Sequence, residues 1–584
     1  MAKNKEKLEF LRHSFAHVSM QALEKLYGAI PGVGPAIEDG FYHDFDCEHQ
    51  VTKEDLKKIE KQMKKIIGQN LKIEKEEMTI PEARKLLKEK KYKYTLELLD
   101  ELEKEGEKKV AFYKQGDFVN MCKGPHVEST GELNAKAFKL VKLAGVYWKG
   151  DEKNKMIQRV YGVAFEKPED LKEYLKRQEE AEKRNHRKIG QEMELFKNFS
   201  EIGQGLPVWL PNGYAMRRAL EDYMIDMERK YGYEHILTPV INKKELFETS
   251  GHLGFFDESM YSPIEIDNEV FYLKPMSCPA GMMAYKMKPR SYRELPIKMG
   301  ELGNVYRYEQ SGELHGLQRV RGFTQNDGHI FCTKDQLKDQ FVEVLEMLEK
   351  FYKDLGFTNY RYRISLSDDK KDKYVGKKED WFKAEKVIRE VLKEKEVDFY
   401  EEKGEATFYG PKLDVQAINV FGKEDSISTI QVDFNLPERF DLTYIDKDKK
   451  KQRPFVIHRA LIGSFERFFA FLIEYYAGKF PLWIAPVQVA VLPVSDKFND
   501  YAEELRLKLA DQRLRVKVFD EDESLGKRIR NAQKQKIPYM LVVGEKEMKA
   551  GAVAVRSRDE GELGVMKYGE FEGKVLQEIQ RKTH

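Results

Sequence analysis

The sequence predicts a multidomain protein that combines α+β and α/β domains, from its length and from two changes of pattern. A chain of 584 residues is too long for one hydrophobic core, so three or four domains are expected. Near residue 200 a mostly helical pattern gives way to strand-rich segments, and after Pro481 strands and helices alternate. The expected segments are 1–165, 166–200, 201–481 and 482–584.

The composition excludes several classes of protein. Lys+Arg 102 against Asp+Glu 100 gives a net charge of +2, so any nucleic-acid binding must use local patches. Four cysteines are too few for a disulfide framework, and the charged start MAKNKEKLEF lacks the apolar core of a signal peptide. The apolar run FFAFLIEYYAGKFPLWIAP is interrupted by Glu474 and Lys479, which favours a buried helix over a membrane span. A cytoplasmic protein is expected.

Residues 1–165 mix amphipathic helical pattern with short, glycine-punctuated strands, which predicts an α+β domain. The stretch HSFAH places His13 and His17 four residues apart, on one face of a helix. The stretch MCKGPH places Cys122 and His126 four apart on a loop, since Gly124 and Pro125 interrupt a helix. Spacing alone leaves two interpretations: a Cys/His zinc site, or a small buried cysteine among ordinary histidines.

The next segments predict a connector and a large strand-rich domain. DLKEYLKRQEEAEKRNHRKIGQEMELF reads as one long, charged helix. Between 201 and 481, EVFYLKP and STIQVDFNLP read as strands, and GELGNVYRYEQSGELHGLQRVRGFTQNDGHIFCT reads as strand, loop, strand with three arginines. Such arginines can clamp a phosphate, and the alternative is an exposed hairpin with solvated charges.

Residues 482–584 read as strand, helix, strand, helix, strand, the order of a small α/β domain. The stretch GKRIRNAQKQK contains five Lys or Arg and no acid. Such a patch attracts phosphate, and the alternative is a solvated basic helix.

These segments resemble the threonyl-tRNA synthetase family of the class II aminoacyl-tRNA synthetases. The arginine-rich hairpin resembles motif 2, HRALIGSFERF resembles motif 3, and DYMIDMERKYGYEHILTPVI resembles motif 1. With MSCPAGM, FYGPKLDV and TIQVDFNLPERF, the similarity covers nearly the whole chain. It implies an editing domain at 1–165, a helical linker at 166–200, an antiparallel-sheet catalytic core at 201–481 and an anticodon-binding domain at 482–584. The N-terminal ubiquitin-like module of many bacterial relatives is expected to be missing.

The resemblance implies a ligase that activates L-threonine with ATP and transfers it to tRNA(Thr). Mg²⁺ is expected with ATP, one Zn²⁺ in each subunit, and a homodimer through motif 1. Serine keeps the hydroxyl of threonine and lacks one methyl, which gives only ~1 to 3 kcal/mol of discrimination. Hydrolytic editing of Ser-tRNA(Thr) is therefore also expected.

The resemblance assigns residues to the catalytic core by motif position. Arg307 and Arg467 are the catalytic arginines, on the α- and γ-phosphate, where fixed charge stabilises the transition state. Asp327 is expected to pair with the substrate ammonium. The other implied residues are Glu309, Arg319 and Phe323 for ATP; Gln325, Tyr409 and Gln431 for threonine; and Cys278, His329 and His458 for zinc, although Cys278 in core packing and Tyr409 in a Gly-Pro turn remain alternatives.

The two flanking domains receive assignments in the same way. His13, His17, Cys122 and His126 match the family's editing positions, which work without metal, so the resemblance replaces the zinc interpretation with hydrolysis. Arg530, Glu547 and Arg556 are implied to read anticodon bases.

Three positions depart from the family pattern. Asn120 replaces a usual aspartate and leaves the strength of editing open, Ser426 replaces a glutamine near the ribose of ATP, and Asp522 replaces an asparagine that contacts a base. Two rival functions remain at this point: a regulatory RNA-binding relative without catalysis, and a free-standing editing hydrolase.

Overall fold

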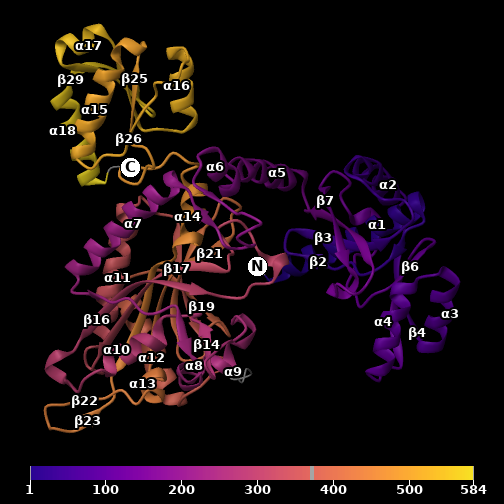
Figure 1. Ribbon diagram of the computed structural model, residues 1–584. Coiled ribbons are helices and arrows are strands. Elements are labelled where there is room, and N and C mark those ends of the chain that lie inside the picture. Colours follow the sequence, from indigo (N-terminus) through magenta and orange to yellow (C-terminus); the bar gives the residue numbers. More distant parts are fainter. Residues whose placement is uncertain (1, 369–373, 583–584) are drawn as a thin grey trace. The chain divides into compact units, whose positions relative to one another are not determined.

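The computed structural model describes residues 2–368 and 374–582. It divides into two compact units, Met1–Glu179 and Glu180–His584 (Figure 1). Each unit buries apolar clusters of its own. Helices accompany antiparallel sheets in both units and a partly parallel sheet near the C-terminus, so the predicted mixture of α+β and α/β folds is confirmed.

The N-terminal unit consists of a long helix on a sheet, followed by a smaller sheet with two helices. Helix α1 (Ala2–Tyr27) contacts β3 and buries Phe15 and Val18. The first sheet has the order β1-β3-β8-β7 with β2 beside β3, and the second has the order β4-β5-β6. The bounds are β1 Ile30–Pro31, β2 Ala36–Ile37, β3 Gly40–Asp46, α2 Leu56–Gly68, β4 Ile73–Thr79, α3 Ile80–Lys90, α4 Lys93–Lys104, β5 Lys109–Gln115, β6 Phe118–Met121, β7 Phe138–Tyr147 and β8 Met156–Ala164.

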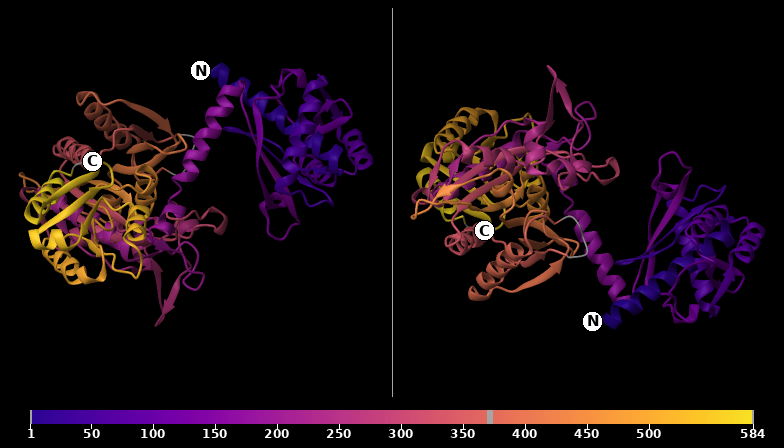
Figure 2. Two further views of the ribbon diagram at one scale, coloured as in Figure 1. Left: turned by 90° about the horizontal axis from the view of Figure 1, so that it is seen from above. Right: turned by 90° about the horizontal axis from the view of Figure 1, so that it is seen from below.

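The connector is two helices, which corrects the single helix expected from the sequence. Helix α5 (Pro168–Lys183) is uninterrupted (Figure 2), and α6 (His186–Glu192) follows it after a short break. Asn185 is the N-cap of α6, and its side chain accepts a hydrogen bond from the backbone N–H of Arg187. An asparagine favours this capping role over a place inside a helix, which explains the break.

The second unit is built on a sheet of eight strands in the order β11-β16-β17-β24-β21-β20-β18-β19. The pairings from β16 to β18 are antiparallel, and the two outermost pairings are parallel. The expected antiparallel core is therefore confirmed. The bounds are β11 Glu234–His235, β16 Ile297–Tyr306, β17 Gly322–Cys332, β18 Tyr360–Leu366, β19 Phe399–Lys403, β20 Lys412–Ile418, β21 Glu424–Asp433 and β24 Phe455–Ser464.

Helices cover both faces of this sheet, and alternate residues of each strand point to different faces. Ile330 and Ile457 belong to the cluster of α7, α11, α12 and α14, whereas Phe331 and Val456 pack with α10 and α13. His329 and His458 have the same parity as Phe331 and Val456, so they lie on the α10 face. The helix bounds are α7 Pro211–Lys230, α8 Lys244–Ser250, α9 His252–Phe255, α10 Cys278–Lys286, α11 Leu337–Asp354, α12 Lys378–Glu394, α13 Leu436–Arg439 and α14 Phe465–Tyr475.

Three small sheets complete this region, in the orders β10-β9, β12-β14-β13 and β15-β22-β23. Their strands are short and carry several of the loops around the large sheet (Figure 1). The bounds are β9 Phe196–Lys197, β10 Val208–Trp209, β12 Ile241–Lys243, β13 Ile264–Ile266, β14 Glu269–Leu273, β15 Arg290–Ser291, β22 Tyr444–Ile445 and β23 Lys451–Gln452.

The C-terminal part folds around a sheet in the order β26-β25-β27-β28-β29. Strand β25 pairs in parallel with β26 and β27, which confirms the predicted strand and helix alternation. The bounds are β25 Val489–Pro493, α15 Asn499–Asp511, β26 Val516–Val518, α16 Leu525–Lys534, β27 Tyr539–Val543, α17 Glu545–Ala550, β28 Ala552–Ser557, β29 Gly561–Lys567 and α18 Tyr568–Arg581.

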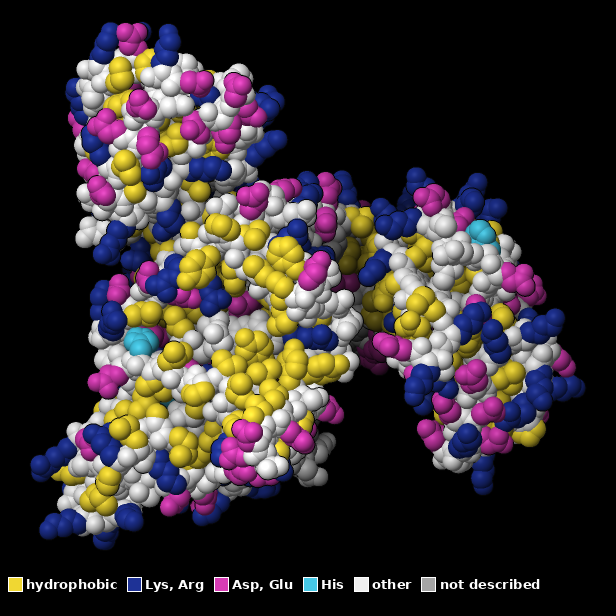
Figure 3. Space-filling view, viewed as in Figure 1, with side chains coloured by type: hydrophobic (Ala, Val, Ile, Leu, Met, Phe, Trp, Pro, Cys, Tyr) yellow, Lys and Arg dark blue, Asp and Glu magenta, His cyan; other side chains and the backbone are white. Residues whose placement is uncertain are grey.

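The visible surface carries both signs of charge on each unit. In Figure 3, Lys and Arg side chains lie among Asp and Glu side chains, whereas hydrophobic side chains gather over the middle of the second unit. Within the described residues, no helix combines the length and the apolar character needed to cross a membrane.

Candidate functional site

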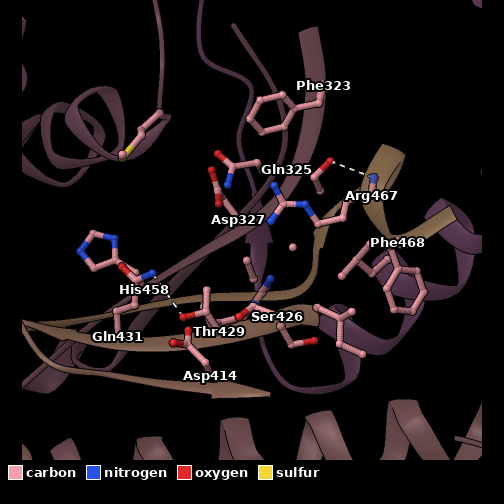
Figure 4. Close-up of a pocket in the computed structure, with 18 of the residues that line it drawn as sticks. Phe323, Gln325, Asp327, Asp414, Ser426, Thr429, Gln431, His458, Arg467 and Phe468 are labelled. Atoms are coloured by element: carbon pink, nitrogen blue, oxygen red, sulfur yellow. Dashed lines mark hydrogen bonds between the residues drawn. The ribbon is translucent and has the colours of Figure 1, made fainter. Parts of the chain in front are cut away.

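A cavity of about 340 Å³ opens on the α10 face of the large sheet. In Figure 4, Phe323, Gln325 and Asp327 lie above it, Thr429 and Gln431 lie below it, and side chains from both sides point inward. Its wall includes every residue that the resemblance assigned to ATP, threonine or zinc. These are Cys278, Arg307, Glu309, Arg319, Phe323, Gln325, Asp327, His329, Tyr409, Gln431, His458 and Arg467.

Strand pairing brings together residues that are far apart in the sequence. Alternation along β17 places Phe323, Gln325, Asp327 and His329 on one face. In the sheet, His329 lies opposite His458 of β24, and His458 lies opposite Gln431 of β21. The ring centroids of the two histidines are 4.9 Å apart. Three adjacent strands thus present one row of polar side chains to the cavity.

Cys278, the first residue of α10, lies at the end of the cavity that holds His329 and His458. Cys278 is buried, and a Cβ placed on Gly281 in the next turn would lie 3.4 Å from Nδ1 of His329. Burial raises the pKa of the Cys278 thiol well above its usual value and lowers the pKa of His329 well below its usual value. Without a metal, burial thus favours the thiol of Cys278 and the neutral imidazole of His329, and a bound cation would favour the thiolate.

Asp433 orients the third candidate ligand, and sequence reasoning missed it. Its Oδ2 lies 2.8 Å from Nε2 of His458, and its side chain is fully buried. A carboxylate on one ring nitrogen leaves the other free, which is the usual arrangement around a metal-bound histidine. Asp433 lies two residues after Gln431 on β21, so strand alternation was the signal that could have found it.

The three candidate zinc ligands line one cavity but do not form the tightest Cys/His cluster. In the part of the chain that the structure describes, only the group His13, His17, Cys122 and His126 has all its potential ligand atoms within 4.8 Å of one another. Donor chemistry supports a metal in the cavity, because one sulfur and two imidazoles are the ligand types that zinc prefers.

Arginines occupy the other end of the cavity. Arg307 donates from Nε to the carbonyl of Pro275 at 3.1 Å, and its guanidinium lies 5.1 Å from the ring centroid of Phe323. Arg467 lies in the first turn of α14, where Ser464 caps the helix by accepting from the Arg467 backbone N–H. Two guanidinium groups and a helix N-terminus favour bound phosphate.

The remaining ATP candidates pair with each other. The Nε of Arg319 donates to the Glu309 carboxylate at 2.7 Å, and a second nitrogen of Arg319 lies 2.8 Å from Glu313. Arg319 and Glu309 both belong to the loop between β16 and β17. Ser426, one of the family departures, also lines the cavity, and its hydroxyl lies 2.7 Å from the amide of Gln416.

Asp327, on β17, has a perturbed pKa. Burial raises its pKa to about 6, with a further contribution from Glu301, its cross-strand neighbour on β16. Glu301 is neutralised by Lys274 at 3.0 Å, and both side chains are buried. On the other wall, the Tyr409 hydroxyl donates to Oε1 of Gln431.

A second site lies in the N-terminal unit. His13 and His17 project from α1, while Cys122 and His126 lie on the loop after β6, as the sequence predicted. The Cys122 sulfur lies 3.2 Å from Nε2 of His13 and 3.4 Å from Nε2 of His126. Nδ1 of His17 is buried without a protein partner. The structure therefore brings all four residues together.

This cluster is electrically neutral near pH 7. Burial raises the pKa of the Cys122 thiol to about 11 and lowers the pKa of His126 to about 3. The pKa values of His13 and His17 are lowered for the same reason. A neutral imidazole can accept a hydrogen bond from water, so the cluster can orient a water molecule for hydrolysis. Asn120, in place of the family aspartate, is buried, and its Oδ1 has no hydrogen-bond partner.

The anticodon candidates lie on three different elements of the C-terminal part. Arg530 is exposed on α16, Glu547 lies on α17, and Arg556 lies on β28. Glu547 accepts from the Gly544 N–H at 3.0 Å, so it also caps its own helix. Arg528 of the basic stretch is buried and donates to the Pro493 and Glu521 carbonyls, which makes it structural.

Family models match three parts of the chain. Residues 261–476 match the class II tRNA synthetase core domain of the G, H, P, S and T enzymes, residues 488–578 match an anticodon binding domain, and residues 110–161 match the threonyl and alanyl tRNA synthetase second additional domain.

Solved structures share the fold. The RNA binding domain of threonyl-tRNA synthetase from Cryptosporidium parvum Iowa II aligns with a TM-score of 0.65 and 34% identity, covering 67% of this chain and 98% of that one. Prolyl-tRNA synthetase from Giardia lamblia aligns with a TM-score of 0.54 and 18% identity, covering 70% and 80%, so it supports the fold alone.

Curated relatives match nearly the whole chain. Threonine–tRNA ligase from Geobacillus kaustophilus (strain HTA426) is 50% identical over 580 residues, which are 99% of this chain and 88% of the relative. Threonine–tRNA ligase 1 from Bacillus subtilis (strain 168) is 50% identical over 581 residues, covering 99% and 90%. By this similarity, and by the class II core on which its cavity is built, the chain belongs to the threonine–tRNA ligase family of class II aminoacyl-tRNA synthetases.

Proposed function

We propose that the protein activates L-threonine with ATP, transfers it to tRNA(Thr), and hydrolyses Ser-tRNA(Thr). One observation carries the proposal: a single cavity has guanidinium groups at one end, and half-buried Asp327 with buried His329 and His458 at the other. ATP phosphates fit the first end and an amino acid fits the second. The carboxylate of threonine then lies beside the α-phosphate that it attacks.

The adenylation step needs positioning and charge rather than a proton carrier. Arg307 holds the α-phosphate and stabilises the negative charge that develops as the carboxylate attacks. Phe323 stacks on the adenine, Glu309 accepts from its amino group, and Arg319 and Arg467 hold the γ-phosphate. Pyrophosphate, accompanied by Mg²⁺, is the leaving group. The Glu309–Arg319 ion pair opens when the nucleotide enters.

The amino-acid end selects threonine. Asp327 pairs with the substrate ammonium, and Gln325, Tyr409 and Gln431 complete the wall. Cys278, His329 and His458 would hold one zinc ion, with Asp433 orienting His458. When bound, the metal would supply a Lewis acid for the amino and hydroxyl groups of threonine.

The N-terminal cluster supports the editing activity. Its neutral histidines and thiol bring together the hydrogen-bonding groups that would hold a seryl ester and a water molecule. We assign the cluster to metal-free hydrolysis, although its close spacing also suits a metal. The C-terminal residues Arg530, Glu547 and Arg556 are assigned to the anticodon of tRNA(Thr).

We further propose the domain limits 1–165 for editing, 166–200 for the linker, 201–481 for catalysis and 482–584 for anticodon binding. Each matched family model falls inside one of these ranges. The four unpaired cysteines support the reducing cytoplasm as the location.

A homodimer through motif 1 is part of the proposal. Leu237 and Ile241, on either side of Pro239, are 84% and 45% exposed, and Met287 after α10 is 77% exposed. Large apolar side chains so exposed are typical of a surface that a second copy covers.

Aminoacylation tests the whole proposal. The purified protein is expected to charge tRNA(Thr) with threonine in the presence of ATP and Mg²⁺, and to deacylate Ser-tRNA(Thr) while sparing Thr-tRNA(Thr). A protein that binds the tRNA without charging it would instead favour a regulatory role, and one that only deacylates would favour a free-standing editing enzyme.

A further inference from the structure

A buried histidine outside the cavity contacts the loop that carries the ATP residues. His186 is the first residue of α6, and its side chain is fully buried. Its Nδ1 lies 2.7 Å from Oε1 of Glu474 on α14, which is also buried. An ionised carboxylate only accepts, so the ring proton sits on Nδ1 and Nε2 carries a lone pair.

That lone pair faces the tip of the loop between β16 and β17. The backbone N–H of Leu317 donates to Nε2 of His186 at 3.2 Å, and the Leu317 side chain is buried. The tip is a tight turn, since His315 N–H donates to the Arg319 carbonyl at 3.1 Å and Arg319 N–H donates back at 3.2 Å. His186 therefore holds a defined turn, residues 315–319, through its backbone.

Gly316 shows how closely the turn approaches the histidine. Its φ of +52° is in the left-handed region, and a Cβ placed there would lie 2.0 Å from Nε2 of His186 and 2.8 Å from Cγ of Arg187. A methyl group at this position would push turn 315–319 away from His186. Gly312, in the same loop and outside the left-handed region, is the control for an added methyl group that meets no other atom within 4 Å.

The far side of the turn contacts the ATP-binding residues. Nε of Arg467 donates to the carbonyl of Gln318 at 3.2 Å, and Arg319 pairs with Glu309. We infer that His186 is a positioning residue: through Leu317 it fixes turn 315–319, and thereby Arg319 and Arg467, for the nucleotide. This inference rests on the proposed adenylation activity.

The glycine pair tests the inference at the point where the turn meets the histidine. Gly316→Ala is expected to raise the KM for ATP roughly ten-fold in threonine-dependent ATP–pyrophosphate exchange, the effect of losing about one hydrogen bond. The KM for threonine should match that of the unaltered protein, whereas the melting temperature should fall, because alanine is strained at this φ. Gly312→Ala should leave all three values unchanged.

Substitutions of the histidine provide the second test. Gln can supply one donor and one acceptor in place of the ring nitrogens, whereas Leu supplies neither. His186→Leu is expected to raise the KM for ATP, and His186→Gln to restore most of it. The single variant His186→Ala and the double variant His186→Ala with Gly316→Ala complete a cycle. Alanine at position 186 gives the methyl group of residue 316 room, so the combined effect should be smaller than the product of the two single effects.

The outcomes separate this inference from the proposed function. An equal KM for ATP in Gly316→Ala and Gly312→Ala would overturn the inference, as would a parallel rise for ATP and threonine. If His186→Leu does not fold, the glycine pair decides. An unaltered protein without threonine-dependent exchange would contradict the proposed function instead.

Discussion

At the scale of single residues, burial dictates the chemistry of the two sites. Cys278 and Cys122 share one effect, because removal from water raises the pKa of each thiol. Their surroundings differ, however. Cys278 lies near Asp327 and arginine side chains at a substrate-sized cavity, whereas Cys122 is surrounded by neutral histidines.

Metal analysis distinguishes the two cysteines. The protein is expected to contain one zinc per chain, which Cys278→Ala should lose and Cys122→Ala should retain, because only the first site has the second-sphere carboxylate Asp433 on a histidine ligand. Elemental analysis of the purified variants checks this. The opposite pattern, with zinc lost only in Cys122→Ala, would move the metal to the N-terminal unit.

Editing has its own residue-level prediction. His13→Ala removes a ring nitrogen 3.2 Å from the Cys122 sulfur, so deacylation of Ser-tRNA(Thr) is expected to fall about 10²-fold, the usual contribution of general acid–base catalysis. Threonylation should be unchanged, since the cavity of the second unit is intact. Normal deacylation by the variant would remove His13 from the mechanism.

At the scale of elements, strand β3 carries a buried histidine whose titration couples to stability. Burial lowers the pKa of His43 to about 4 from the 6.5 of an exposed histidine. Between these values the unfolded chain binds a proton that the folded chain does not. The free energy of unfolding of the N-terminal unit is therefore expected to fall as the pH drops from 6.5 to 4, by on the order of 3 kcal/mol.

Hydrogen exchange in β3 measures this effect. Protection of the β3 amides, corrected for intrinsic exchange, should decrease between about pH 7 and about pH 5, and His43→Leu should weaken that dependence because leucine does not titrate. An identical pH dependence in the variant would show that other groups, such as His17 and His126, account for it.

The elements also show how much the sequence could predict. Strand β17 was predictable from the strand, loop, strand pattern of the arginine-rich hairpin, and the C-terminal strands and helices were predictable from their regular order. The break before α6 was not, since a local cap at Asn185 competes with an otherwise continuous helical pattern. Strand alternation places Asp433 on the same face as Gln431, but its contact with His458 also depends on the pairing of β21 with β24, which the sequence does not encode locally.

The site residues also differ in how far the sequence predicts them. The arginines, the polar residues of the cavity wall and the N-terminal cluster were assigned by motif resemblance, and the structure brings each of these sets to one place. His186 escaped notice because its partners, Glu474 and Leu317, are 288 and 131 residues away along the chain. Long-range contacts of this kind arise only from the folded arrangement.

At the scale of the whole molecule, the exposed apolar residues around motif 1 predict self-association. Leu237→Glu combined with Ile241→Glu is expected to shift the protein from dimer to monomer in sedimentation velocity, because two buried charges at an interface lack partners. Phe382→Glu, a change at a 65% exposed residue of α12, is the matched control and should remain dimeric. An unaltered protein that sediments as a monomer would refute the dimer.

The most direct test of the whole account is the amino-acid dependence of ATP–pyrophosphate exchange with and without a metal chelator. The account predicts exchange with threonine, weaker exchange with serine, almost none with valine, and loss on chelation that zinc restores. Exchange that ignores the choice of amino acid, or none at all with threonine and zinc present, would contradict it.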